Sequence, residues 1–259
     1  VLISGNAIGR SGAKVGDDGI DIDTVTGGAT VSIINNTDIR AADNGIEISG
    51  PVNGGASVTI SGNNHGIHAD DHGIYFGSAL SGGATVNIHD NIIGANEDHD
   101  STGSGIWFDG TRTSATVNIG DGAYGSFTGG ASNIIRVDGN AGGSQSGLDG
   151  IHFDDDIGSG AVINIDGNRL GYFAFSVGGP LTEERLADDG IEFSGEIKGN
   201  ADINITDNYI RAKGDGVRFS DKIRDFANVL IGGLGDNNAI NAWHNGVSFL
   251  NDITGQSLF

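Results

Sequence analysis

One short phrase recurs eight times along this 259-residue chain, so the chain must fold as a stack of similar units. The phrase is G-I-x-F or a close variant. Its first apolar residue is Ile20, Ile46, Ile74, Ile106, Ile151, Ile191, Val217 and Val247. A second phrase, V-x-I-x-x-N-x-I, alternates with it. Together they make a unit of about 26 to 32 residues before insertions, which is typical of a solenoid.

The two phrases predict three short strands in each unit. Alternation with period 2 places the Ile, Val and Phe side chains on one side of each strand, and Gly, Asn and Asp fill the corners. Strands this short cannot bury a core alone, so we expect about eight stacked coils that share one continuous core. The single expected helix is short and spans 180–190, with Pro180 near its start and Gly190 at its end.

An asparagine recurs at the second corner of the unit. The positions are Asn6, Asn36, Asn63 or Asn64, Asn91, Asn133, Asn168, Asn208 and Asn238. Stacked amides can bond to one another and to the turn backbone, which predicts a ladder. In these features the chain resembles the right-handed parallel β-helix family typified by pectate lyases. The resemblance implies an all-β, right-handed, single-stranded parallel β-helix (a β-solenoid) as a single domain over 1–259, and it implies no particular activity.

Composition excludes several classes of function. The chain has no Cys, which excludes disulfides, thiolate metal sites and Cys nucleophiles. A formal charge of −21 opposes binding to nucleic acid and to anionic membranes. No apolar run approaches the roughly 18 residues that a membrane helix needs, so we expect no membrane insertion. The acidic, Gly-, Asn- and Asp-rich composition predicts an extracellular or cell-surface protein of a bacterium.

The variable residue of G-I-x-F faces outward and forms a column along the coils. The column reads Asp21, Glu47, Tyr75, Trp107, His152, Glu192, Arg218 and Ser248. Coils of a parallel sheet lie about 4.8 Å apart, so Tyr75, Trp107 and His152 should be neighbours, with Asp109 and Asp154 beside them. Insertions are expected at 94–104, 120–132, 136–149 and 171–189, and three of them open onto this face. We therefore expect any ligand to bind across Tyr75, Trp107, Asp109, His152 and Asp154.

The same face holds the candidate catalytic residues Asp109, His152 and Asp154. Paired carboxyls roughly 5 to 5.5 Å apart would suit a retaining glycosidase. A stacked pair is also expected by chance in a chain so rich in Asp, and exposed aromatics on a strand are common without a ligand. The acidic surroundings would repel a polyuronate, so a neutral polysaccharide is the better candidate ligand.

Runs of Asp at the corners raise the question of calcium, a hard ion that binds several oxygens. The runs are Asp17–Asp18, Asp70–Asp71, Asp154–Asp156 and Asp188–Asp189. No EF-hand loop is present, so we expect solvated turn carboxylates, with Ca²⁺ binding as the alternative. The seven His residues show no metal-binding spacing, and no other cofactor is expected.

The leading hypothesis is an extracellular structural or adhesive β-solenoid, part of a larger bacterial surface or filament-forming protein. Val1 and Leu258 occupy the same phase of the repeat, so expected partners are further coils of a longer chain or other copies of itself. The alternative is a polysaccharide-active enzyme, a lyase or a glycosidase, or a glycan-binding module of the same fold.

Overall fold

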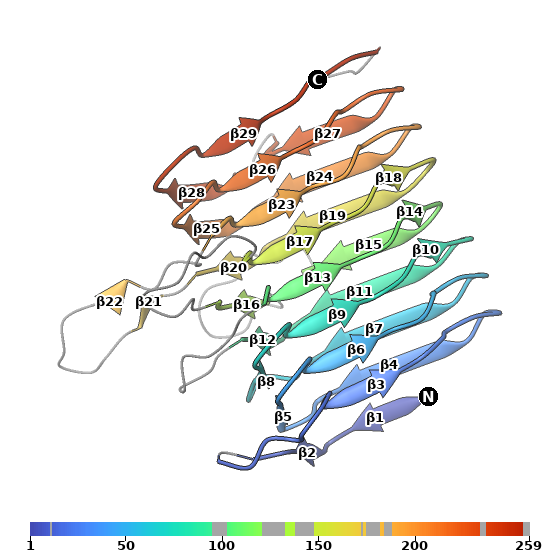
Figure 1. Cartoon of the computed structure of the whole chain (residues 1–259), viewed down its shortest axis with the longest axis vertical. Coiled ribbons are helices and arrows are strands. Elements are labelled where there is room, and N and C mark those ends of the chain that lie inside the picture. The colour runs from blue at the N-terminus through green and yellow to red at the C-terminus, as the bar shows by residue number, and fades with distance from the viewer. Residues whose placement is uncertain are drawn as a thin grey trace.

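The chain forms a right-handed parallel β-helix in which each of three sheets receives one strand per coil (Figure 1). The computed structural model describes residues 1–10, 12–94, 103–120, 133–137, 148–171, 173–174, 182–183, 188–233 and 237–255. The coils stack in chain order, from blue at one end to red at the other in Figure 1. The predicted fold class is confirmed.

Each long sheet has eight parallel strands. The V-x-I phrase forms the first: β1 (Leu2–Ser4), β4 (Thr30–Ile34), β7 (Ser57–Ser61), β11 (Thr85–His89), β15 (Thr116–Ile119), β19 (Val162–Asp166), β24 (Asp202–Thr206) and β27 (Asn228–Ile231). The second follows the asparagine corner: β2 (Ala7–Ile8), β5 (Asp38–Ala41), β8 (Ile67–Ala69), β12 (Ile92–Ile93), β16 (Ile134–Ile135), β20 (Arg169–Leu170), β25 (Tyr209–Ala212) and β28 (Ala239–Ala242). The G-I-x-F phrase forms the third: β3 (Ile20–Ile22), β6 (Ile46–Ile48), β9 (Ile74–Phe76), β13 (Ile106–Phe108), β17 (Ile151–Phe153), β23 (Ile191–Phe193), β26 (Val217–Phe219) and β29 (Val247–Phe249).

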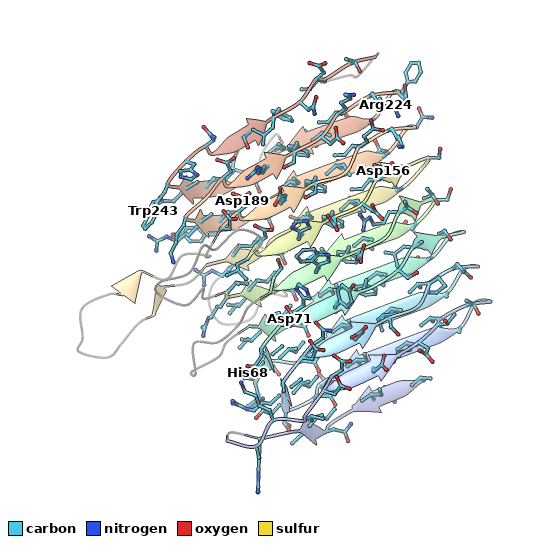
Figure 2. The ribbon with its side chains drawn as sticks, viewed as in Figure 1. His68, Asp71, Asp156, Asp189, Arg224 and Trp243 are labelled. Atoms are coloured by element: carbon cyan, nitrogen blue, oxygen red, sulfur yellow. The ribbon has the colours of Figure 1, made fainter. Side chains whose placement is uncertain are left out.

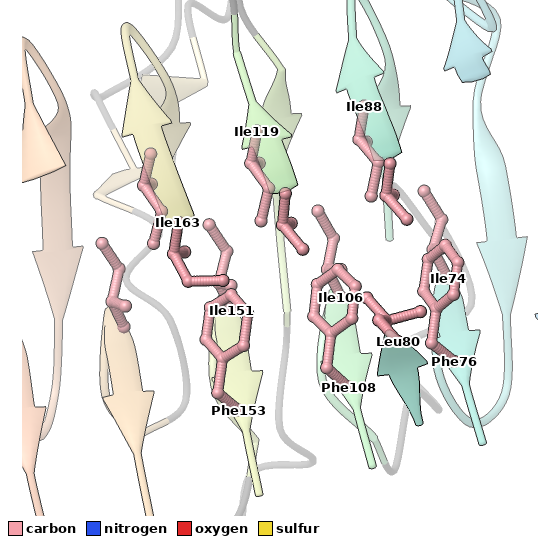
Figure 3. Packing of buried hydrophobic residues seen from close by; sticks show 14 of the residues in the cluster. Ile74, Phe76, Leu80, Ile88, Ile106, Phe108, Ile119, Ile151, Phe153 and Ile163 are labelled. Atoms are coloured by element: carbon pink, nitrogen blue, oxygen red, sulfur yellow. The ribbon is translucent and has the colours of Figure 1, made fainter. Parts of the chain in front are cut away.

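Identical repeat positions pair with one another, and this builds the core. Ile74 pairs with Ile46 on one side and Ile106 on the other, and all three are fully buried. The Phe of the same phrase stacks along the axis: the rings of Phe108 and Phe153 lie 4.8 Å apart and 2° from parallel (Figure 3). One hydrophobic cluster runs from Ile20 to Ala227. Every coil therefore covers the apolar side chains of the coil before it.

The Gly of the G-I phrase is required by the approach of the next coil. A Cβ on Gly73 would lie 2.3 Å from Cγ2 of Ile93 and 2.7 Å from the carbonyl oxygen of Gly105. Both contacts are shorter than carbon atoms tolerate, so any side chain would push the coils apart. This explains why the first letter of the phrase is constant.

The predicted asparagine ladder is present and continuous. It uses Asn63 rather than Asn64, and the side-chain amide of each member donates to the Oδ1 of the next, at 2.8 to 3.2 Å, from Asn6 to Asn238. Asn91, Asn168 and Asn208 are buried within it. The side-chain amide of each buried member also donates to a carbonyl oxygen of a first-sheet strand one coil earlier, for example Asn168 to Ile119 at 2.8 Å. The ladder thus satisfies backbone groups that the corner would otherwise leave unpaired.

A fourth, short sheet departs from the three strands expected per coil. It contains β10 (Leu80–Ser81), β14 (Arg112–Thr113) and β18 (Ile157–Gly158), and isolated bridges extend the same column from Val25 to Ile253. Arg112 stands among the Val, Leu and Ile of this column and is fully buried. Its guanidinium donates to the carbonyl oxygens of Phe108 (3.0 Å) and Asp155 (2.6 Å) and lies 5.4 Å from the centre of the Phe153 ring.

The prediction of a helix over 180–190 is wrong for the residues of this range that the structure describes. Thr182–Glu183 form strand β22, which pairs antiparallel with β21 (Phe173–Ala174). No helix occurs in the described part of the chain. The expected insertions at 94–104, 120–132, 136–149 and 171–189 lie mostly outside the described residues, as does Leu258.

Candidate functional site

The outward residues of the third sheet form the predicted column. Trp107 on β13 pairs with Tyr75 on β9 and with His152 on β17, and His152 pairs with Glu192 on β23. Asp109 and Asp154 each follow the paired Phe residues by one position. The sheet register therefore brings all five predicted site residues onto one face of the stack.

The aromatic rings of this face stack on one another rather than standing free. The rings of Trp107 and His152 are 4.2 Å apart and 7° from parallel. His72, from the corner before β9, stacks on Tyr75 at 5.3 Å and meets Trp107 at 4.7 Å with a 53° tilt. One face of the indole is consequently covered by His152, and His72 packs against the ring as well. Any ligand on this surface would meet ring edges and polar groups rather than an open aromatic platform.

A hydrogen bond joins Tyr75 to Asp109 of the next coil. The Tyr75 hydroxyl donates to Oδ2 of Asp109 at 3.2 Å, and Oδ1 of Asp109 accepts the Gly110 N–H at 2.7 Å. Burial, followed by the charge of Asp109, raises the pKa of Tyr75 to about 12. The phenol therefore stays protonated and remains a donor at physiological pH.

His152 is the most enclosed member of the face. Although it points outward, it is only 5% exposed. Its Nδ1 lies 2.6 Å from Oδ2 of Asp149, and its Nε2 lies 3.1 Å from Oγ of Ser194 and 3.7 Å from Oδ1 of Asp154. Burial lowers the pKa of His152, but the hydrogen bond to Asp149 and the charges of Asp149, Glu192 and Asp154 outweigh it and raise the pKa overall.

A second ladder, which sequence analysis missed, runs along the corner just before the strands of the third sheet. Its members are the residues just before the Gly of each G-I phrase, and each backbone N–H donates to the side chain of the member one coil earlier. They are Asp18, Asn44, His72, Ser104, Asp149, Asp189, Asp215 and Asn245. We call this the corner ladder; Asp189 marks its place in Figure 2. The signal in the sequence was that Asp, Asn, His or Ser, each able to accept a hydrogen bond, always precedes the Gly of the phrase.

Corner carboxylates are therefore not all solvated, which corrects the expectation for Asp188–Asp189. Asp189 is 1% exposed; its Oδ1 accepts the Asp215 N–H at 2.5 Å and its Oδ2 lies 3.3 Å from Nη1 of Arg218. Burial raises the pKa of Asp189 to about 7, with added repulsion from Asp149, Asp188 and Glu192. Burial likewise raises the pKa of Asp149. These carboxyls have structural roles as backbone acceptors.

Two groups of side chains could hold a cation. Among the described residues, Asp17, Asp18 and Asp43 bring carboxylate oxygens within 4.8 Å of one another at a corner, and Asp149, His152 and Glu192 bring two carboxylate oxygens and an imidazole nitrogen equally close on the outer side of the third sheet. In both groups an oxygen already accepts a protein hydrogen bond, Asp18 from the Asn44 N–H and Asp149 from the Asp189 N–H. Calcium binding stays a prediction.

A groove on the opposite face was also missed. It measures about 470 Å³ and lies over the first sheet, where the middle residue of V-x-I is Asn in four successive coils. The amides of Asn118, Asn164 and Asn204 each donate to the Asn of the preceding coil, at 2.8 to 3.0 Å. Thr59, His89, Gly120 and Asp166 also line the groove. The recurrence of V-N-I or I-N-I in these four strands was the sequence pattern that could have predicted this row of Asn side chains.

Comparison with known proteins adds no identity. No family model, no curated protein and no solved structure matches this chain. Among the described residues, no helix is long and apolar enough to cross a membrane.

Proposed function

We propose that this chain is a rod-like structural or adhesive segment of an extracellular bacterial surface or filament-forming protein. The observation that carries the proposal is the continuity of the stack. The asparagine ladder runs from Asn6 to Asn238 and the corner ladder from Asp18 to Asn245, alongside one hydrophobic core. Each coil adds about 4.8 Å of length while burying its neighbour's core, which suits a spacer that must stay extended.

The net charge of the chain supports association along the axis of the stack. Asp and Glu number 34 against 13 Lys and Arg. A net charge far from zero keeps an extended protein from associating along its sides through like-charge repulsion. Contacts along the axis are then favoured over contacts between parallel rods.

Apolar side chains on the last described coil support an axial partner. Val247 (37% exposed), Phe249 (42%) and Ile253 (38%) occupy positions that are buried in earlier coils. A further coil or the first coil of another copy would cover them, at roughly 1.5 to 3 kcal/mol per side chain. We therefore include coils of a longer chain, or further copies, as the partners of this stack.

Light scattering and negative-stain microscopy of the 259-residue chain test this role. We expect rods that lengthen with protein concentration. Phe249→Lys should suppress the lengthening, because it places a charge where the next coil would sit. Asn251→Lys, an exposed position of the same coil, is the matched control and should leave association intact. A chain that stays monomeric at high concentration would contradict axial association.

Glycan binding is the second candidate, and a specific geometry favours it. Tyr75, Trp107, Asp109, His152 and Asp154 present ring edges and carboxylates on one face, a mixture that suits neutral hydroxyl-rich ligands. Titration of neutral and acidic oligosaccharides against wild type, Trp107→Ala and Asn118→Ala would test it. Loss in Trp107→Ala alone supports this face, and loss in Asn118→Ala alone transfers binding to the groove of the first sheet. Equal binding by all three proteins excludes both positions.

A further inference from the structure

We propose that Ser194 is a nucleophile activated by His152 and Asp149, and that these three residues hydrolyse carboxylic esters. The activity goes beyond the structural role proposed above and does not depend on it. The side chains form one hydrogen-bonded line. Asp149 Oδ2 lies 2.6 Å from His152 Nδ1, and His152 Nε2 lies 3.1 Å from Ser194 Oγ. A carboxylate and a hydroxyl joined through the two different nitrogens of one imidazole is the arrangement that activates a serine.

Each member of the line is held in place by other contacts. Asp149 is fully buried, and its Oδ1 accepts the Asp189 N–H at 3.0 Å, which leaves Oδ2 for His152. The indole of Trp107 stacks on the imidazole and fixes the plane of the ring. Ser194 follows β23 directly, and its N–H donates to the Phe153 carbonyl oxygen at 2.9 Å. The geometry therefore exists before any substrate arrives.

The hydrogen bonds also assign the protons. In the neutral imidazole, Nδ1–H donates to the Asp149 carboxylate and Nε2 keeps the lone pair that accepts the Ser194 hydroxyl proton. Because the pKa of His152 is raised, this form increases as pH rises through that pKa. Ser194 is partly exposed, whereas His152 and Asp149 are buried. The hydroxyl is thus the member of the line that a substrate can reach, as a nucleophile must be.

The reaction then follows in two balanced steps. Ser194 Oγ forms a bond to the ester carbonyl carbon as its proton passes to His152 Nε2. The ester C–O bond breaks, and the leaving alcohol takes that proton, which leaves an acyl-serine. Water next attacks the acyl carbon, gives one proton to His152 Nε2 and releases the carboxylic acid, and His152 returns the proton to Ser194. No oxidant, reductant or further reactant is needed.

Nearby charges limit the class of ester. Asp154 Oδ1 lies 3.7 Å from His152 Nε2, and Glu192 Oε2 lies 3.6 Å from Nδ1. Negative groups this close repel an anionic substrate. Uncharged esters, such as short acyl groups on neutral alcohols or sugars, are the class that the surroundings admit.

The next coil supplies a matched control. Ser220 occupies the position of Ser194 one coil later, and its Oγ donates to Oε1 of Glu192 at 2.7 Å. It makes an inter-coil contact of the same kind, but directly to a carboxylate rather than to the nitrogen of an imidazole. If the Ser194 contact were only part of the stacking pattern, the two serines would have similar reactivity.

Labelling with an alkyl fluorophosphonate, read by intact mass and peptide mapping, tests the proposal, with p-nitrophenyl acetate as the turnover probe. We expect one adduct, on Ser194. Ser194→Ala should abolish labelling and turnover, and Ser220→Ala should react as wild type does. A folded wild type with no adduct on Ser194, or with Ser194 and Ser220 labelled equally, would overturn the proposal.

Asp149→Asn distinguishes an activated serine from an exposed one. The Asn Oδ1 still accepts the Asp189 N–H, but its NH₂ then faces His152 Nδ1 and forces the proton onto Nε2. Labelling should slow by roughly 10³- to 10⁴-fold. If Asp149→Asn proves too unstable to test, His152→Gln replaces it. Its side chain can bond Asp149 but cannot accept a proton, so labelling should slow by the same factor. Labelling at the wild-type rate in a folded variant of either kind would rule out the proposed activation.

Discussion

Asn208 Oδ1 accepts two hydrogen bonds from Asn168, one from the backbone N–H and one from the side-chain amide, both at 3.0 Å. Asn168 in turn accepts the amide of Asn133 at 2.9 Å and caps the carbonyl oxygen of Ile119. One side chain thus satisfies buried polar groups in three successive coils. Every coil therefore depends on its ladder residue, because removing one Asn leaves hydrogen-bonding groups unpaired in the coils on both sides.

Asn168→Ala should therefore lower the free energy of unfolding by about 1 to 3 kcal/mol, since buried donors and acceptors lose their partners. Chemical denaturation measures this directly. Asn164→Ala is the control, because Asn164 lies on the same coil in the row of outward Asn side chains over the first sheet, where it is partly exposed and water can replace the lost bonds. We expect it to cost no more than about 0.5 kcal/mol. Equal losses in the two variants would contradict a special role for the inner corner.

The glycine of the repeated phrase gives a prediction with an internal control. Gly73→Ala should destabilise strongly, by about 1 to 3 kcal/mol, because the new Cβ would collide with Ile93 and with the backbone of Gly105. Gly246 holds the same place in the last coil, and a Cβ there would meet nothing within 4 Å. Gly246→Ala should be neutral or stabilise slightly, since Ala restricts the unfolded chain.

Thermal melts of the two glycine variants side by side decide the matter. If Gly246→Ala proved as damaging as Gly73→Ala, the glycine would be needed for its own backbone conformation rather than for the approach of the next coil.

Asp189 should make the protein less stable as pH rises from about 4 to 7. Its pKa is about 7 when folded against an ordinary value of 3.8, so between these values the folded state holds a proton that the unfolded state has released. Stability is then fully present below pH 4 and is lost as pH rises through the folded pKa. Asp189→Asn keeps an acceptor for the Asp215 N–H and cannot ionise. Asn44 already accepts the His72 N–H at the equivalent position of an earlier coil.

Relative to wild type, Asp189→Asn should gain roughly 1 to 3 kcal/mol between pH 4 and pH 8. Urea unfolding at a series of pH values measures this gain. Asp189→Ala removes the acceptor as well and should be less stable than Asp189→Asn at every pH. A difference between wild type and Asp189→Asn that does not change with pH would show that Asp189 is not protonated in the folded state.

The fold could be predicted because a short period repeats the same physical requirement eight times. Ile74 and Ile106 face the same core, so one strand's alternation repeats in the next. The choice between Asn63 and Asn64 could not be made, since both fit the spacing and only the turn geometry separates them. The enclosure of His152 depends on Trp107, Asp149 and Ser194, which lie up to 45 residues away in sequence and meet only through the coil register. The insertions change that spacing from coil to coil.

The corner ladder was missed for a different reason. Asp149, Ser104 and His72 look unrelated as residue types, and only their shared ability to accept a backbone N–H makes them equivalent. Arg112 was missed because a charged residue in an apolar column contradicts the pattern, and the backbone oxygens that hold it belong to Phe108 and Asp155.

Arg112 gives the last prediction, a contrast between two substitutions. Burial lowers the pKa of Arg112 to about 10, and its Nε, buried with no hydrogen-bond partner among the described residues, adds to the cost of keeping the charge inside. Neighbours in the same column are Leu80 and Ile157. Arg112→Leu should restore that apolar column and leave stability within about 1 kcal/mol of wild type, because it removes a desolvated charge along with its bonds. Arg112→Ala should cost about 2 to 4 kcal/mol, because it also leaves a cavity beside Phe153. Denaturant unfolding of both variants provides the measurement. If Arg112→Leu were as unstable as Arg112→Ala, the bonds to the Phe108 and Asp155 carbonyls would outweigh the desolvation of the guanidinium, and Arg112 would be an essential brace of this corner.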